Sequence, residues 1–322
     1  MKETFMKTRM RKTLAPFMAS ALALSFAGAV YAQDTETSAS TTEMDTTELK
    51  TLDLKEGEGL DEEIVNARMR ANSGSRSKIS MSTSMAYNGG SIEDPLSENR
   101  PNLDGDPAVE TDTDLNGSIS ARYRFSDKVS ATFGAGVGVL KPLHGAEELN
   151  IDNPGVGLSR YYKLGAFQAS TSASLTAGTS EAWKDVNNTS RLGFSQNMMA
   201  QIGDSNFTAG ASLAFTKRFY SDDLDRYDYT LGFYPQLEYE ITDKLVARTV
   251  FGYFNYYSMR DSSTFDMSSF KSPSGEDFMY QSVGLGIVAT RDIYLYPNIQ
   301  FLPNDFGLDK TNVAISATIN LF

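Results

Sequence analysis

The carboxy-terminal three quarters of the chain alternates between two kinds of side chain with a period of two. Between Val129 and Val139 every odd position is apolar, and the even positions between them are serine, threonine or glycine. Successive side chains of a β-strand point to opposite faces, so this segment has one apolar face and one small, polar face. When such segments repeat along a chain, their apolar faces can lie against a protein core or against lipid.

Twelve segments from Lys78 onward carry a strand pattern. They cover residues 78–87, 114–125, 129–140, 154–164, 167–179, 189–203, 207–219, 227–241, 245–257, 278–289, 293–302 and 311–322. Short turns and long loops alternate between them, which is typical of a barrel in an outer membrane. Each segment is ten to fifteen residues long, enough for a tilted strand to cross the hydrocarbon layer. We therefore predict an all-β transmembrane barrel of twelve antiparallel, up-and-down strands. A secreted soluble β protein is the alternative, but its closed barrel would leave the bulky faces in water.

The first 32 residues have the features of a cleavable secretory signal. Basic side chains at Lys2, Lys7, Arg9, Arg11 and Lys12 precede an apolar run, Leu14 to Val30. The small-residue site Val30-Tyr31-Ala32 follows, and we expect cleavage after Ala32. Cleavage removes five basic residues and one acidic residue, which leaves 24 Lys and Arg against 40 Asp and Glu, a formal charge of −16.

Charge and composition exclude several classes of function. The excess of carboxylates argues against nucleic acid as a partner, because phosphate binding needs a basic surface. The chain has no cysteine, so disulfides, thiolate metal sites and a cysteine nucleophile are excluded. We predict no cofactor and no metal site.

A polar linker and a helix precede the barrel. Residues 33–47 are acidic and free of aromatic side chains, which is typical of a disordered linker. An apolar stripe at helical spacing then predicts a helix, with Asp61 to Glu63 in its first turn and Arg68 and Arg70 near its end. The stripe consists of Leu60, Ile64, Ala67 and Ala71. The expected divisions are a signal peptide at 1–32, linker and helix at 33–76, and the barrel at 77–322.

The apolar stripe is too long to leave in water, so the helix needs a partner. It could plug the pore, bind a periplasmic protein, or join copies of the chain. We expect homo-oligomerisation through Leu60, Ile64, Ala67 and Ala71 in preference to plugging.

These features resemble the bacterial outer-membrane β-barrel proteins of the porin-like, twelve-stranded type. The last strand carries Val313, Ile315, Ala317, Ile319 and Leu321 on one face and ends in Phe322. The resemblance implies contact with outer-membrane lipids and lipopolysaccharide, and recognition of this strand by the barrel-assembly machinery. The chain departs from the family pattern at Asn320, where another apolar residue is usual. The acidic helix before the first strand also resembles major outer-membrane proteins of predatory Bdellovibrio-like bacteria.

Side-chain parity sorts the charged residues of the strands into two faces. The inward, pore-lining set is Lys78, Arg122, Arg124, Lys163, Arg191, Arg218, Asp228, Glu238, Glu240 and Arg248. Charges inside a membrane-spanning structure are costly unless they face water or pair. Seven of them lie toward the short-turn end, all except Arg191, Arg218 and Asp228, where a mixed ring could constrict the lumen with a mild preference for anions. The alternative is that they form salt bridges that only fill the barrel.

The sequence thus predicts a narrow aqueous channel for passive diffusion of ions and small solutes. A structural or assembly barrel with a filled lumen is the second hypothesis. An outer-membrane phospholipase or protease is the third, with His144 as base and Ser159 or Glu147 near it in sequence. No catalytic constellation accompanies His144, so we predict no catalytic residues and no enzyme.

Overall fold

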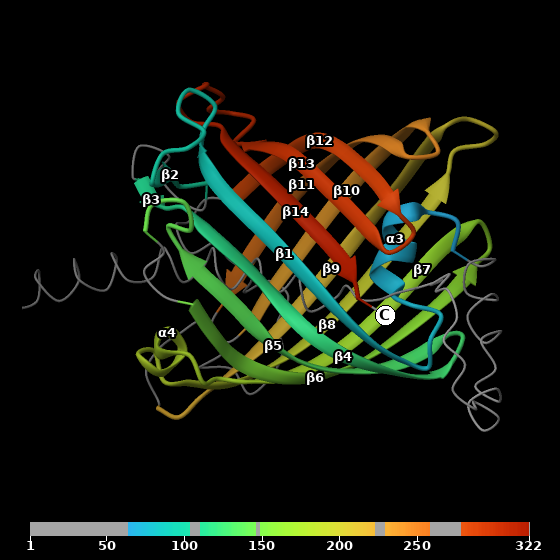
Figure 1. Ribbon diagram of the computed structural model, residues 1–322, viewed down its shortest axis with the longest axis horizontal. Coiled ribbons are helices and arrows are strands. Elements are labelled where there is room, and N and C mark those ends of the chain that lie inside the picture. Colours follow the sequence, from blue (N-terminus) through green and yellow to red (C-terminus); the bar gives the residue numbers. More distant parts are fainter. Residues whose placement is uncertain (1–63, 104–109, 146–148, 223–228, 258–277, 322) are drawn as a thin grey trace, which may run out of the picture.

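The computed structural model describes residues 64–103, 110–145, 149–222, 229–257 and 278–321. Twelve antiparallel strands in these ranges form one closed barrel (Figure 1). The first strand closes it, because β1 pairs with β4 on one side and with β14 on the other. The prediction of a twelve-stranded antiparallel barrel is confirmed.

The observed strands overlap all twelve predicted segments. They are β1 (Ile79–Ser91), β4 (Asp114–Ser126), β5 (Val129–Leu140), β6 (Leu149–Leu164), β7 (Phe167–Ala177), β8 (Asn188–Gln201), β9 (Phe207–Tyr220), β10 (Tyr229–Thr242), β11 (Leu245–Tyr257), β12 (Phe278–Thr290), β13 (Ile293–Phe301) and β14 (Asn312–Asn320). Short connections lie at one end of the barrel and long loops at the other. Within the described residues, two of the long loops contain small elements that the sequence pattern did not predict: the hairpin β2 (Asn99–Pro101) and β3 (Glu110–Asp112), and one helical turn, α4 (Glu181–Lys184).

The outer and inner faces of the barrel differ in chemistry as the alternation predicted. Large apolar side chains remain exposed on the outside, among them Phe133, Leu158 and Leu175, with 63%, 56% and 50% of their surface accessible. Inward positions carry buried polar residues such as Ser82 and Gln236. An apolar outside around a polar inside is the arrangement of a barrel that crosses a membrane, where lipid solvates the outer face.

The helix before the barrel is shorter than predicted. It is α3 (Ala67–Ser73), and its first turn contains no acidic residue. The Asn66 side chain caps it by accepting a hydrogen bond from the backbone N–H of Met69, 3.0 Å away. Gly74, with a φ of 84°, ends it, in the left-handed region that glycine adopts without strain. No helix in the described ranges is both long enough and apolar enough to cross a membrane.

Two of the residues predicted to form an oligomer contact are buried within a single chain. Ile64 and Ala71 are 0% and 1% exposed within a single chain, and Ala67 is half-buried. Figure 1 shows α3 at the barrel end where the chain also ends. Ile64 and Ala71 pack against the inner wall of their own barrel, and homo-oligomerisation through this helix stays a prediction. Leu60 lies outside the described residues.

Candidate functional site in the barrel lumen

We call residues 64–77 the lumen segment, because they lie inside the barrel at its short-turn end. Ile64 and Met69 pack with Tyr161 of β6 and Met199 of β8. Ala71 packs with the rings of Tyr294 and Tyr296 on β13, on the opposite side of the barrel. The segment therefore spans the lumen from wall to wall.

A buried charge cluster fixes the start of α3 to strands β10 and β11. Glu238 lies 3.3 Å from the Nε of Arg68 and 3.3 Å from the Nε of Arg248, and it accepts a hydrogen bond of 2.6 Å from Asn66. The amide oxygen of Gln236 accepts from both guanidiniums, at 2.9 and 3.1 Å. Burial and the neighbouring Arg248 lower the pKa of Arg68, and Glu238 opposes that shift. One carboxylate thus balances two cations, one from the helix and one from the wall.

The end of α3 and the residues after it are held through their backbone carbonyls. Five successive carbonyl oxygens, from Ala71 to Ser75, each accept a hydrogen bond from the barrel. The donors, in chain order of the acceptors, are Asn320 (3.2 Å), Tyr161 (2.9 Å), Arg122 (2.5 Å), Arg291 (2.9 Å) and Arg124. The last carbonyls of a helix have no partner within it and carry partial negative charge. Three guanidiniums, two from β4 and one from the turn between β12 and β13, supply the matching positive charge.

These contacts change the role expected for the residues of the predicted constriction. Arg122, Arg124, Arg248 and Glu238 do point inward at the short-turn end, and they are 3%, 1%, 9% and 4% exposed. Each contacts the lumen segment directly or through a shared partner. In this arrangement the four side chains contact backbone and side-chain groups of the protein itself.

The other predicted inward residues fall into two groups. Lys78, Lys163 and Glu240 are exposed at the short-turn rim. Arg191 and Arg218 are buried near the long loops, 6% and 9% exposed, and are cross-strand partners on β8 and β9. Asp228 lies outside the described residues.

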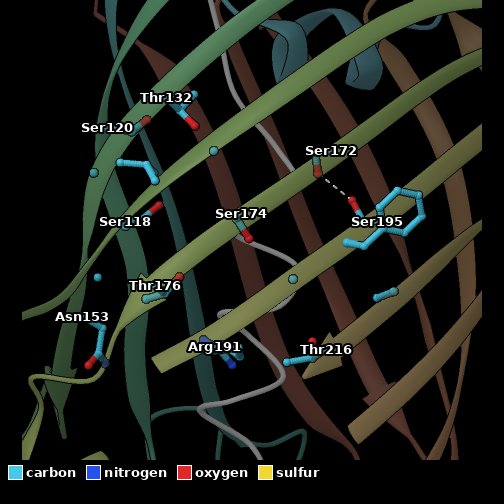
Figure 2. Close-up of a pocket in the computed structure, with 18 of the residues that line it drawn as sticks. Ser118, Ser120, Thr132, Asn153, Ser172, Ser174, Thr176, Arg191, Ser195 and Thr216 are labelled. Atoms are coloured by element: carbon cyan, nitrogen blue, oxygen red, sulfur yellow. Dashed lines mark hydrogen bonds between the residues drawn. The ribbon is translucent and has the colours of Figure 1, made fainter. Parts of the chain in front are cut away.

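A small-residue wall borders a cavity within the lumen. It is formed by the inward positions of β4 to β9, which surround a cavity of about 110 Å³ (Figure 2). Its polar lining includes Ser118, Ser120, Thr132, Asn153, Ser172, Ser174, Thr176, Arg191, Ser195 and Thr216. A space lined by hydroxyls and glycines is both roomy and polar, which is what ordered water requires.

The catalytic alternative finds no support in the geometry. His144 follows β5 at the long-loop end, where its Nε2 contacts the carbonyl oxygen of Leu96. Ser159 pairs with Ser130 near the short-turn end of the same hairpin, so the two side chains lie at opposite ends of the barrel. Glu147 is outside the described ranges. Among the described residues, no group of three or more His, Asp or Glu is placed to hold a metal ion.

No known protein-family profile matches the chain, and no curated protein matches its sequence. Among solved structures, it is similar to the NanC porin, with 10% identity over 75% of this chain and 100% of that one and a TM-score of 0.43. It is also similar to an outer-membrane channel from Pseudomonas putida F1 (8% identity, 75% and 95% covered, TM-score 0.47) and to the KdgM porin in complex with disordered oligogalacturonate (11%, 75% and 99%, 0.38). Each of these neighbours is a porin or an outer-membrane channel. Nothing in them indicates a Bdellovibrio-like origin, which stays a prediction.

The sequence pattern alone did not identify several residues of this site. Arg68 was assigned only to a helix end, although an arginine beside an apolar stripe can bind a buried carboxylate such as Glu238. Asn320 was noted as a departure from the family pattern. Its side chain faces the lumen and donates to Ala71, which gives that departure a physical reason. Trp183, the chain's one tryptophan, lies in a long loop and was not considered.

Proposed function

We propose that the protein is an outer-membrane channel for passive diffusion of ions and small solutes, and that its lumen segment narrows the path at the short-turn end. The cavity along the small-residue wall carries this proposal. Strands β4 to β9 present hydroxyls and glycines to the lumen where a filled barrel would present large interlocking side chains. The outer face would contact outer-membrane lipids and lipopolysaccharide.

The lumen segment would act on conductance from within its own barrel. Its side chains reach β6, β8, β10 and β13, and its carbonyls reach β4, β6 and β14. A segment held on so many strands takes up cross-section that water would otherwise fill. Plugging therefore replaces homo-oligomerisation as the proposed role of α3.

A structural barrel with a largely filled lumen is the second candidate. The cluster of Arg68, Glu238 and Arg248 favours it, because buried charges that are paired and hydrogen-bonded stabilise one fixed arrangement. The two candidates differ in whether ions cross the barrel.

Planar-bilayer recordings separate them. The full-length protein is compared with a variant lacking residues 33–75 and with a control lacking only 33–60, which keeps the whole lumen segment. We expect a measurable conductance for the full-length protein and the control, and a larger one for the 33–75 deletion. Absence of conductance in all three proteins, at any voltage, would overturn the channel. Equal conductance in all three proteins would show that the lumen segment does not narrow the conducting path.

A further inference from the structure

The outer face of the barrel carries few charged side chains, and those that it carries are basic. Along the described barrel strands, the outward-facing positions hold two charged residues, Arg160 on β6 and Lys217 on β9. The same described positions hold no aspartate or glutamate, although the whole chain has 41 acidic and 29 basic side chains. A charge on a lipid-facing surface lowers stability unless it reaches the headgroup level or has a partner there. The basic character of this face therefore indicates contact with negatively charged groups outside the protein.

Arg160 lies where the outer face of the barrel approaches the short turns. Its strand ends at Leu164, and its partner on the neighbouring strand is Val129, the first residue of β5 after a short turn. At the same end, the exposed rings of Tyr123 and Phe125 project from the outer face of β4. Exposed aromatic side chains of this kind mark the level of the lipid headgroups. Arg160 is therefore placed at the membrane boundary on the short-turn side.

The ring of Tyr162 holds the guanidinium of Arg160. The Cζ of Arg160 lies 5.6 Å from the centroid of this ring, a distance at which a cation is attracted to the face of an aromatic ring. The ring is itself fixed, because the Tyr162 hydroxyl lies 3.0 Å from that of Thr171 and donates to the amide oxygen of Gln196 at 3.2 Å. Arg160, Thr171 and Gln196 are successive cross-strand partners and so share the outer face. We call these three residues and Tyr162 the outer polar patch.

The guanidinium of Arg160 has no hydrogen-bond acceptor in the described part of its own chain. Arg160 is exposed, and among the described residues its side chain takes part in no hydrogen bond or ion pair. A second copy could not supply a carboxylate from its described strands, since their outward positions hold none. The phosphate of a phospholipid lies at this level of the membrane and carries the matching charge. A planar guanidinium binds two oxygens of one phosphate through its parallel N–H groups.

We infer that the outer polar patch binds the phosphate group of a phospholipid, with Arg160 as the residue that recognises it. The ring of Tyr162 positions Arg160, and Thr171 and Gln196 hold the ring. The inference goes beyond the proposed function, because it concerns the outer face and holds whether or not ions cross the lumen. It requires only that lipid surrounds the barrel.

Native mass spectrometry of the intact protein measures this binding directly. Full-length protein in a neutral detergent is titrated with dioleoyl phosphatidylglycerol. Two further probes are titrated in parallel: dioleoylglycerol, which has the same chains without the phosphate, and glycerol 3-phosphate, which has the phosphate without the chains. We expect a retained adduct with the phospholipid and none with either of the other probes.

Variants made in a Lys217→Gln background assign the adduct to Arg160, because this background removes the other outward cation of the described strands. Adding Arg160→Gln should raise the half-saturation concentration about tenfold, as expected for the loss of a charge-assisted hydrogen bond. Adding Arg160→Lys keeps the charge but not the planar group, and should raise it less. The control Lys244→Gln removes a positive charge from the turn between β10 and β11 at the same end, and should bind as the background does.

The outcomes separate this inference from the proposed function. Equal affinity in the Arg160→Gln variant, or equal retention of dioleoylglycerol or glycerol 3-phosphate, overturns the phospholipid site. A dimer that dissociates in the Arg160→Gln variant also overturns it, by assigning Arg160 to a contact between copies. None of these results changes the bilayer prediction. A protein that conducts no ions and keeps the Arg160-dependent adduct overturns the channel alone.

Discussion

The Nε of Arg68, on the helix that precedes the barrel, lies 3.3 Å from a carboxylate oxygen of Glu238, 170 residues further along the chain. Both side chains are buried, with 9% and 4% of their surfaces exposed. This pair fixes the helix inside the barrel. Since Glu238 also contacts Arg248, the helix can be weakened without leaving the carboxylate unpaired.

Replacing Arg68 with alanine should loosen the lumen segment and leave the barrel folded. Breaking a buried ion pair lowers the free energy of unfolding by about 3–5 kcal/mol when the remaining charge has no partner. Because Arg248 still pairs with Glu238 in this variant, we expect a loss of about 3 kcal/mol or less. We expect a higher mean conductance in planar bilayers. Arg160→Ala removes an exposed arginine from the outside of β6 and should leave conductance unchanged. If both variants conduct alike, the Arg68–Glu238 pair does not restrain the path.

Deleting residues 33–75 should also change ion selectivity. The deletion releases Arg122, Arg124 and Arg291 from the carbonyls that they bind. Basic side chains that line a pore favour anions. The reversal potential under a salt gradient should therefore move toward that of chloride.

In the variant that lacks residues 33–75, adding Arg122→Gln and Arg124→Gln should reverse most of the shift in reversal potential. If the deletion moved the reversal potential toward that of the cation, Arg122 and Arg124 would not be lining the conducting path of the deletion variant.

A crosslink can show whether α3 contacts its own barrel or that of another copy. The chain has no native cysteine, so Ala71→Cys with Asn320→Cys creates a single reactive pair. The Asn320 amide nitrogen lies 3.2 Å from the Ala71 carbonyl oxygen. A short bifunctional thiol reagent should join the two within one chain.

The product should run as a monomer in denaturing gels and gain the mass of one linker, whereas Ala71→Cys alone should carry a singly attached reagent. A dimer-sized band from the double variant would show that α3 contacts another copy of the chain.

Gly178→Ala should disturb the seat of Trp183. The added Cβ would lie 2.2 Å from the carbonyl oxygen of Asn188 and 2.8 Å from the indole ring, closer than such atoms approach in folded proteins. The loop must shift, so the indole should gain exposure and its emission should move to longer wavelength. Gly138→Ala meets only the side-chain oxygen of Asn116, at 3.3 Å, and should leave the emission unchanged. An unshifted spectrum for Gly178→Ala would show that the loop tolerates the methyl group.

Local pattern determined the barrel. A period of two assigns every strand residue to one of two faces, and a one-residue slip would turn all of them over. Twelve strands, their alternating connections and the inward direction of Arg122, Arg191 and Glu238 followed from that rule. The small elements in the loops did not, because β2, β3 and α4 are three or four residues long and carry no period to recognise.

Only the tertiary structure decided what occupies the lumen. The apolar stripe of α3 required a partner, and sequence gave no means of choosing between another copy and the chain's own barrel. The choice rests on contacts between residues far apart in sequence, such as Arg68 with Glu238 and Ala71 with Asn320. Parity sets the direction in which a side chain points, and only the closed barrel determines what it meets there.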